Sequence, residues 1–201
     1  MSLAGIVVAA GRGERFGGPK HLIEVGGVAI WERARSLLRA AGAGEIVVVG
    51  DVPGGIPGGE RRRDSVAAGL ARLVSGPEWV LVHDAARPLA SLELARRVVG
   101  RLIGGHADAV IPVVPVRDTI KRVEDDVVLS TVDRSLLAAA QTPQGFRVAR
   151  LRDAQASDSA DAPDEAALLE SAGCRVVTVP GDPGNLKLTF PEDLVVLEAL
   201  L

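Results

Sequence analysis

Short apolar runs alternate along the chain with longer stretches in which apolar residues recur at helical spacing. The runs predict strands at Leu3–Ala9, Glu45–Val49, Trp79–His83, Ala109–Val114 and Arg175–Pro180. The stretches between them predict helices at Ala29–Ala41, Asp64–Val74, Leu92–Ile103 and Asp164–Ala172. Strands that are apolar throughout are typical of parallel strands covered on both faces. The order of elements therefore predicts a doubly wound, mostly parallel, Rossmann-like α/β sheet.

One segment departs from this alternation. Residues Arg117–Val123 and Val127–Val132 have strand-like composition and flank Glu124, Asp125 and Asp126, which predict a hairpin turn. An isolated two-stranded hairpin is marginal in water. We therefore expect an arm at about 115–135 that packs on a second subunit, making a homodimer. A hairpin folded back onto its own domain is an equal alternative.

The composition fits one domain over residues 1–201. The chain is 47% hydrophobic with a mean hydropathy of +0.24, which argues against disorder. The net charge of −3 and the scarcity of aromatic residues, with no Tyr, argue against a nucleic-acid partner.

No apolar run reaches the length of a membrane span, so no membrane association is expected. The start of the chain lacks the basic region of a signal peptide. A lone cysteine, Cys174, cannot form an internal disulfide, which suits a reducing compartment. These features predict a cytoplasmic protein.

The first strand runs into a glycine-rich, cationic loop. Between Gly11 and Gly18 there are four glycines, and Arg12, Arg15 and Lys20 are interspersed with them or follow them. Glycines allow exposed backbone N–H groups to approach an anion closely, and the cations suit a polyphosphate. The third Rossmann glycine and the Walker lysine are both absent. The loop therefore predicts a nucleoside triphosphate site of another kind, with an ordinary flexible loop as the alternative.

Three further segments carry chemistry that the local sequence leaves open. Asp84 ends an apolar strand and can hold Mg²⁺ beside phosphates, or it can be a turn acid paired with Arg87. Ser65 can cap the helix that follows or line a ligand site. Lys187 is by default a surface lysine. No arrangement of a nucleophile with a base, and no zinc cluster, is evident.

These segments together carry a family resemblance over nearly the whole chain. The motifs, in order, are V-A-A-G-R-G-E-R-F at 8–16 with P-K at 19–20, R-D-S-V-A-A-G-L at 63–70, V-L-V-H-D-A-A-R-P at 80–88, P-V-R-D-T-I-K at 115–121, V-D-R at 132–134, T-P-Q at 142–144 and N-L-K-L-T-F-P-E-D-L at 185–194. The set closely resembles the 2-C-methyl-D-erythritol 4-phosphate cytidylyltransferases of the non-mevalonate isoprenoid pathway. The glycine-rich loop is shared by many nucleotidyltransferases, whereas H-D-A-A-R-P with P-V-R-D-T is more specific.

The resemblance implies a nucleotidyltransferase fold, CTP and methylerythritol phosphate as substrates, Mg²⁺, and a homodimer clasped by the arm. Arg15, Lys20 and Lys187 would be catalytic, and Asp84 would support the metal and the nucleotide. The remaining CTP-binding residues would be Ala9, Ala10, Gly11, Gly13, Gly59 and Ser65. The acceptor-binding residues would be Thr119, Arg134 and Thr142, with the two arm residues reaching across the dimer interface.

The chain departs from the family pattern at three positions. Pro163 replaces an expected threonine, Gly184 replaces an acidic residue, and Glu60 replaces a shorter acid. Two other functions stay open on the sequence: transfer of a nucleotide to another polyol or sugar phosphate, and nucleotide binding without turnover.

Overall fold

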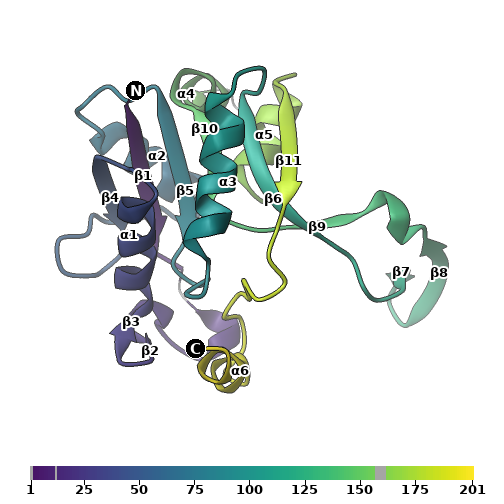
Figure 1. The fold of residues 1–201 in the computed structure, drawn as a ribbon. Coiled ribbons are helices and arrows are strands. Elements are labelled where there is room, and N and C mark those ends of the chain that lie inside the picture. The colour runs from purple at the N-terminus through teal and green to yellow at the C-terminus, as the bar shows by residue number, and fades with distance from the viewer. Residues whose placement is uncertain (1, 12, 157–161) are drawn as a thin grey trace.

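The structure is a computed structural model that describes residues 2–11, 13–156 and 162–201. Its central sheet has the order β11-β6-β10-β5-β1-β4, and β9 pairs with β6 off this path (Figure 1). The strands are β1 (Leu3–Val8), β4 (Glu45–Val49), β5 (Trp79–Asp84), β6 (Ala109–Pro115), β9 (Ala138–Ala140), β10 (Gln144–Arg147) and β11 (Val176–Pro180). All five predicted strands are present, with ends that shift by one residue at most. The predicted α/β class is confirmed.

Helices cover both faces of the sheet, which explains why its strands are apolar throughout. The helices are α1 (Ile30–Ala40), α2 (Arg62–Arg72), α3 (Leu92–Ile103), α4 (Val148–Ala156), α5 (Glu165–Ser171) and α6 (Asp193–Ala199). Leu38 of α1 and Leu102 of α3 belong to one apolar cluster, whereas Leu70 of α2 and Leu151 of α4 belong to the other. The β1 side chains alternate between these clusters, since Val7 lies in the first and Ile6 in the second.

The sequence analysis missed a strand in the middle of the sheet. Strand β10 runs antiparallel to both of its neighbours, β5 and β6. Its four residues, Q-G-F-R, have too little apolar pattern to predict a strand, and Gly145 is needed because α3 passes close above it. A Cβ on Gly145 would lie 2.9 Å from Leu102 Cδ2 and 3.0 Å from Val98 Cγ1. The helix α4 and the small hairpin of β2 (Glu24–Val25) and β3 (Val28–Ala29) were also not predicted.

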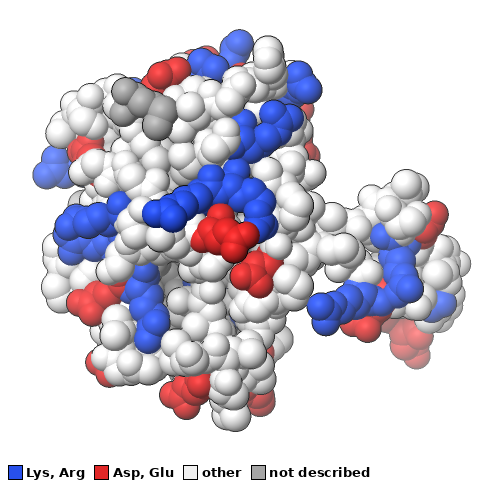
Figure 2. All heavy atoms as spheres, in the orientation of Figure 1, with Lys and Arg blue, Asp and Glu red and all other residues white. Residues whose placement is uncertain are grey.

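The predicted hairpin forms an arm that stands away from the body. Strands β7 (Ile120–Glu124) and β8 (Val127–Val132) pair only with each other among the described strands, and Asp125 turns the chain with a φ of 50°. Figure 1 shows the arm to one side of the sheet, and Figure 2 shows that a narrow neck joins it to the body. The alternative of a hairpin folded back onto its own domain is therefore wrong.

The arm exposes apolar side chains that a free hairpin would not favour. Val123, Val127 and Val128 are each more than half exposed, and Leu136, just beyond β8, is 83% exposed.

Within the described residues, no helix has both the length and the apolar character that crossing a bilayer requires.

Candidate active site

A cleft of about 830 Å³ opens where β1 and β5 end, at the carboxyl edge of the parallel strands. This is the edge at which ligands bind in open α/β sheets. Its lining includes the three predicted catalytic residues, Arg15, Lys20 and Lys187. It also includes every predicted CTP-binding residue: Ala9, Ala10, Gly11, Gly13, Gly59, Ser65 and Asp84. Tertiary structure thus gathers residues from four separate motifs into one cleft.

The glycine-rich loop forms one wall of this cleft through a tight turn at Gly13. That residue has a φ of 67°, and its carbonyl accepts hydrogen bonds from the N–H groups of Phe16, Gly17 and Gly18. A Cβ at Gly13 would lie 1.9 Å from the Gly18 carbonyl oxygen, so only glycine fits. The short 3₁₀ turn that follows, Glu14–Phe16, carries Arg15. Arg12, which the sequence analysis grouped with these cations, lies outside the described residues.

The start of α2 forms the opposite wall. The Gly59 N–H donates a hydrogen bond of 3.1 Å to Ser65 Oγ, so the Ser65 hydroxyl fixes the loop before the helix. Helix capping falls to Asp64, whose carboxylate accepts from the Arg61 N–H at 3.1 Å. A Cβ on Gly59 would come within 2.3 Å of Asp64 Cβ. Of the two roles left open for Ser65, the structure supports the shaping of the cleft wall.

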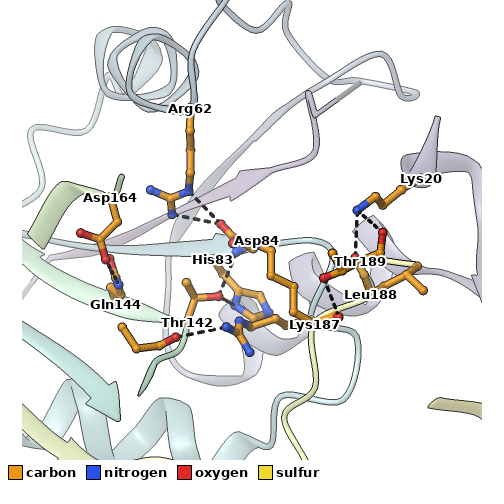
Figure 3. A network of polar contacts seen from close by, with 12 residues as sticks. Lys20, Arg62, His83, Asp84, Thr142, Gln144, Asp164, Lys187, Leu188 and Thr189 are labelled. Carbon is orange, nitrogen blue, oxygen red and sulfur yellow. Dashed lines mark hydrogen bonds and ion pairs between the residues drawn. The ribbon is translucent and has the colours of Figure 1, made fainter. Parts of the chain in front are cut away.

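Asp84 lies at the floor of the cleft between two cations. Its Oδ2 is 2.8 Å from Lys187 Nζ, and its Oδ1 accepts from Arg62 Nε at 3.1 Å and Nη2 at 3.0 Å (Figure 3). Burial opposes the charge, but Arg62 and Lys187 outweigh it and hold the pKa of the Asp84 carboxyl well below its usual range. Arg87 is not its hydrogen-bonding partner, because that guanidinium donates to the Asn185 and Ala140 carbonyls.

Lys20 reaches the same cleft from the glycine-rich loop. Its Nζ donates to the Leu188 carbonyl at 3.0 Å, which ties the loop to the segment that carries Lys187. Burial, together with the charges of Arg15 and Lys187, lowers the Lys20 pKa. Several cations therefore share a confined space, an arrangement that suits an anion with several charges.

The side chains at the floor of the cleft supply too few oxygen ligands to hold a metal without a bound phosphate. Among the described residues, no group of three or more His, Cys, Asp or Glu side chains is placed to hold a metal. Asp84 supplies a single carboxylate, and Mg²⁺ commonly takes one or two carboxylates and completes its shell with phosphate oxygens and water. The residues thus fit a metal that arrives with phosphates.

The predicted acceptor-binding residues lie elsewhere. Thr119 and Arg134 flank β7 and β8 and belong to the arm, which stands away from the body (Figure 1), and neither lines the cleft. Arg134 Nη1 donates to the Arg117 carbonyl, which is also on the arm. Thr142 is buried, and its Oγ1 accepts from the Asp84 N–H at 3.1 Å and lies 2.8 Å from His83 Nδ1. In this structure the Thr142 hydroxyl supports the backbone below Asp84, and its contact with an acceptor stays a prediction.

His83 is fully buried beside Thr142, and this burial makes stability depend on pH. Burial lowers the His83 pKa from 6.5 to about 4. Between those values the unfolded chain binds a proton that the folded chain does not, so the free energy of unfolding falls as pH falls from 6.5 to 4. The expected loss from this group is about 3 kcal/mol.

Urea unfolding between pH 4 and 7 measures that loss. We expect the free energy of unfolding of His83→Gln to depend less steeply on pH than that of the wild-type chain. His106→Asn is the matched control, because His106 is exposed, and it should keep the wild-type slope. Equal slopes for wild type and His83→Gln would contradict the assignment of a buried neutral imidazole.

The sequence analysis missed Arg62, although Arg62 lines the cleft. Three consecutive arginines take three different directions: Arg61 pairs with Asp64, Arg62 bonds to Asp84, and Arg63 is buried against the Gln155 carbonyl. A run of like charges at a helix start usually indicates a solvated surface. The one feature of the sequence that could have indicated Arg62 is its position, because the three arginines lie between Gly59 and Ser65, which were both predicted to bind CTP.

Two departures from the family pattern are accommodated locally. After Pro163, Asp164 caps α5, since its Oδ1 accepts from the Ala167 N–H at 3.0 Å and its Oδ2 accepts from Gln144 Nε2 at 2.9 Å (Figure 3). The Gly184 N–H donates to Asp182 Oδ1 at 2.8 Å, so a neighbouring acid orders that loop. At the third departure, Glu60 lines the cleft.

Comparisons with known proteins show the family of the chain. The family model described as 2-C-methyl-D-erythritol 4-phosphate cytidylyltransferase matches residues 3–201. A relative of that name from Saccharopolyspora erythraea is 43% identical over the full length of both chains. One from Frankia casuarinae is 44% identical over 99% of this chain and 81% of its own.

Among solved structures, the crystal structure of 2-C-methyl-D-erythritol 4-phosphate cytidylyltransferase from Thermus thermophilus has a TM-score of 0.86 and 35% identity. The similarity covers 100% of this chain and 98% of that one. Sequence, family model and fold agree, and the chain belongs to the 2-C-methyl-D-erythritol 4-phosphate cytidylyltransferase family.

Proposed function

We propose that the cleft transfers a cytidylyl group from CTP to 2-C-methyl-D-erythritol 4-phosphate, as the family name describes, in isoprenoid precursor biosynthesis. The acceptor phosphate attacks the α-phosphorus of CTP, which forms 4-diphosphocytidyl-2-C-methyl-D-erythritol and releases pyrophosphate. The observation that carries the proposal is the convergence of Arg15, Lys20 and Lys187 on one cleft floored by Asp84.

The residues explain how the reaction proceeds without a general base. A phosphate monoester has a second pKa of about 6, so the acceptor is already largely ionised near neutral pH. His83 lies below the floor with no exposed surface, where it cannot take a proton from the acceptor. The barrier is the approach of anions and the charge that develops on the phosphates. Fixed cations lower that barrier, and this is the role assigned to Arg15, Lys20 and Lys187.

We infer that Mg²⁺ accompanies CTP and that Asp84 holds it. A bound Mg²⁺ would neutralise the triphosphate charge and aid the departure of pyrophosphate. The chain's own contribution is to present Asp84 ionised, with one oxygen toward Arg62 and the other toward Lys187. We also propose a cytoplasmic location, where CTP is available.

The arm supports a homodimer in which each cleft is completed by the other chain. Its exposed valines need a partner surface, and the arm to which Thr119 and Arg134 belong stands away from the body that holds their own cleft (Figure 1). A second copy of the chain would cover the valines and place these polar side chains over the neighbouring acceptor site.

A pyrophosphate-release assay tests the function directly. With Mg²⁺ present, we expect turnover with CTP and 2-C-methyl-D-erythritol 4-phosphate and little with ATP, GTP or UTP. The same assay with ribitol phosphate in place of 2-C-methyl-D-erythritol 4-phosphate tests the alternative function, cytidylyl transfer to another polyol phosphate. Preference for ribitol phosphate would overturn the acceptor assignment, and binding of CTP without turnover would support a non-catalytic module. Removal of Mg²⁺ by EDTA should stop the reaction, and excess Mg²⁺ should restore it.

The arm proposal predicts that Arg134→Ala raises the KM for the acceptor at saturating CTP. Loss of one charged hydrogen bond predicts a rise of about 10- to 100-fold with a smaller change in kcat. Arg122→Ala, also exposed on the arm, is the matched control. An unchanged acceptor KM in Arg134→Ala would contradict the assignment.

Mixing two impaired variants tests whether the arm acts across the dimer. After subunit exchange, Arg134→Ala and Lys187→Ala should together regain about a quarter of wild-type activity at low acceptor concentration, because half the dimers then hold one intact composite site. No recovery, or a stable monomer in sedimentation at micromolar concentration, would rule out an arm that works in the partner's cleft.

A further inference from the structure

One guanidinium, that of Arg62, joins two carboxylates from different elements. Its Nε and Nη2 donate to Asp84 Oδ1 at the end of β5, and its Nη1 donates to Glu165 Oε2 at the start of α5. The planar fork of an arginine fixes the angle between such contacts, which a lysine cannot do. The position of Glu165 therefore sets the direction from which Arg62 approaches Asp84.

Glu165 is an unusual residue to find at its position. Its side chain has 0% exposure, and its Oε1 has no hydrogen-bond partner among the described residues. Burial raises the pKa of the Glu165 carboxyl, and the charge of Arg62 opposes that rise. A buried ion pair is seldom more stabilising than an apolar pair of similar size. A contribution to stability alone therefore does not explain why a carboxylate is buried at position 165.

The surrounding structure holds Glu165 in place. Asp164 caps α5 through the Ala167 N–H and is itself bound by Gln144 Nε2 from β10. Glu165 is the first residue of that helix, so its Cα is fixed by both contacts. Arg62, by contrast, lies at the cleft with a side chain 23% exposed, and a long side chain there needs a second anchor to keep one orientation.

We infer that Glu165 is a positioning residue for cytidylyl transfer, holding Arg62 so that its fork engages Asp84 Oδ1 and leaves Asp84 Oδ2 to Lys187. This inference rests on the proposed function, since it assigns Glu165 to the reaction at that cleft. Glu165 is outside the cleft lining and acts only through Arg62. The competing explanation is that Glu165 merely ties α5 to the sheet.

A double-mutant cycle separates the two explanations. The variants are Glu165→Gln, Arg62→Gln and their combination, and Glu170→Gln on the exposed face of α5 is the matched control. The readouts are kcat/KM for CTP, the Kd for CTP by calorimetry, and the thermal midpoint. We expect Glu165→Gln to lower kcat/KM by about 10- to 100-fold, Arg62→Gln to lower it at least as much, and the combination to equal Arg62→Gln alone.

The inference is overturned if Glu165→Gln keeps kcat/KM within about twofold of wild type, or if the losses of the two single variants multiply. A role confined to stability would lower the thermal midpoint and leave the kinetics of the folded fraction unchanged. If Glu165→Gln does not fold, Arg62→Lys replaces it. Lysine keeps the charge but cannot bridge both carboxylates, so Arg62→Lys should lose nearly as much kcat/KM as Arg62→Gln. Full activity in Arg62→Lys would overturn the inference.

The wild-type enzyme distinguishes this inference from the proposed function. If wild type shows no CTP-dependent turnover, the proposed function fails. If wild type turns over normally and the cycle shows no coupling, only the role of Glu165 fails.

Discussion

Replacing Lys187 with alanine is expected to lower kcat by about 10²- to 10³-fold while the chain still folds. Lys187 lines the cleft, and its Nζ lies 2.8 Å from Asp84 Oδ2. Its positive charge is most valuable when negative charge grows at the α-phosphate, so the loss should fall mainly on kcat. The side chain is 42% exposed, and Asp84 keeps its contact with Arg62, so stability should change little.

Steady-state pyrophosphate release with both substrates saturating measures this effect. Arg35→Ala, an exposed cation on α1, is the control for loss of positive charge and should behave as wild type. Lys187→Ala with a kcat within about threefold of wild type would exclude Lys187 from transition-state stabilisation.

Lys20→Ala is expected to cause a loss of similar size, about 10²- to 10³-fold in kcat, together with a higher KM for CTP. Lys20 stands at the end of the glycine-rich loop and is anchored on the Leu188 carbonyl at 3.0 Å. That contact holds its ammonium in the cleft before nucleotide binds. Because the triphosphate is charged in the ground state as well, binding and catalysis should both suffer.

A second substitution separates charge from geometry at this position. Lys20→Arg keeps the positive charge but replaces a compact ammonium with a broad planar group, so it should restore only part of the activity. The exposed Arg39→Ala on α1 is the control, and an unchanged thermal midpoint shows that the loop has not collapsed. Near-wild-type kcat and KM in Lys20→Ala would contradict the triphosphate assignment.

The local sequence was sufficient where one element is determined by its own residues. Ser91 caps α3 by accepting from the Leu94 N–H at 3.2 Å, and Gly42 and Gly173 follow helices with φ of 101° and 71°. Each of these depends on one backbone conformation and one short-range contact. The apolar strands were equally clear, because burial on both faces leaves a continuous apolar run.

Local sequence was insufficient where the structure of a segment depends on residues that are distant in the sequence. Strand β10 is a strand because β5 and β6 leave a place between them, and its own four residues do not show it. Thr142 belongs to the T-P-Q motif, but only the tertiary structure shows that its hydroxyl accepts a hydrogen bond from the Asp84 N–H. Nothing near Glu165 in the sequence indicates its partner Arg62, which is 103 positions away.

By itself the sequence determined the fold class, the glycine-rich loop, the arm and the family. These follow from periodicity, from the backbone freedom of glycine and from ordered motifs, all of which are properties of consecutive residues. Tertiary structure alone decided which charges meet. It brought Lys20 and Lys187 to one cleft and paired Asp84 with both Arg62 and Lys187. It also kept the arm, to which Thr119 and Arg134 belong, away from the body that holds that cleft. The physical reason is that electrostatic interactions depend on distance and burial, which the sheet order sets across the whole chain.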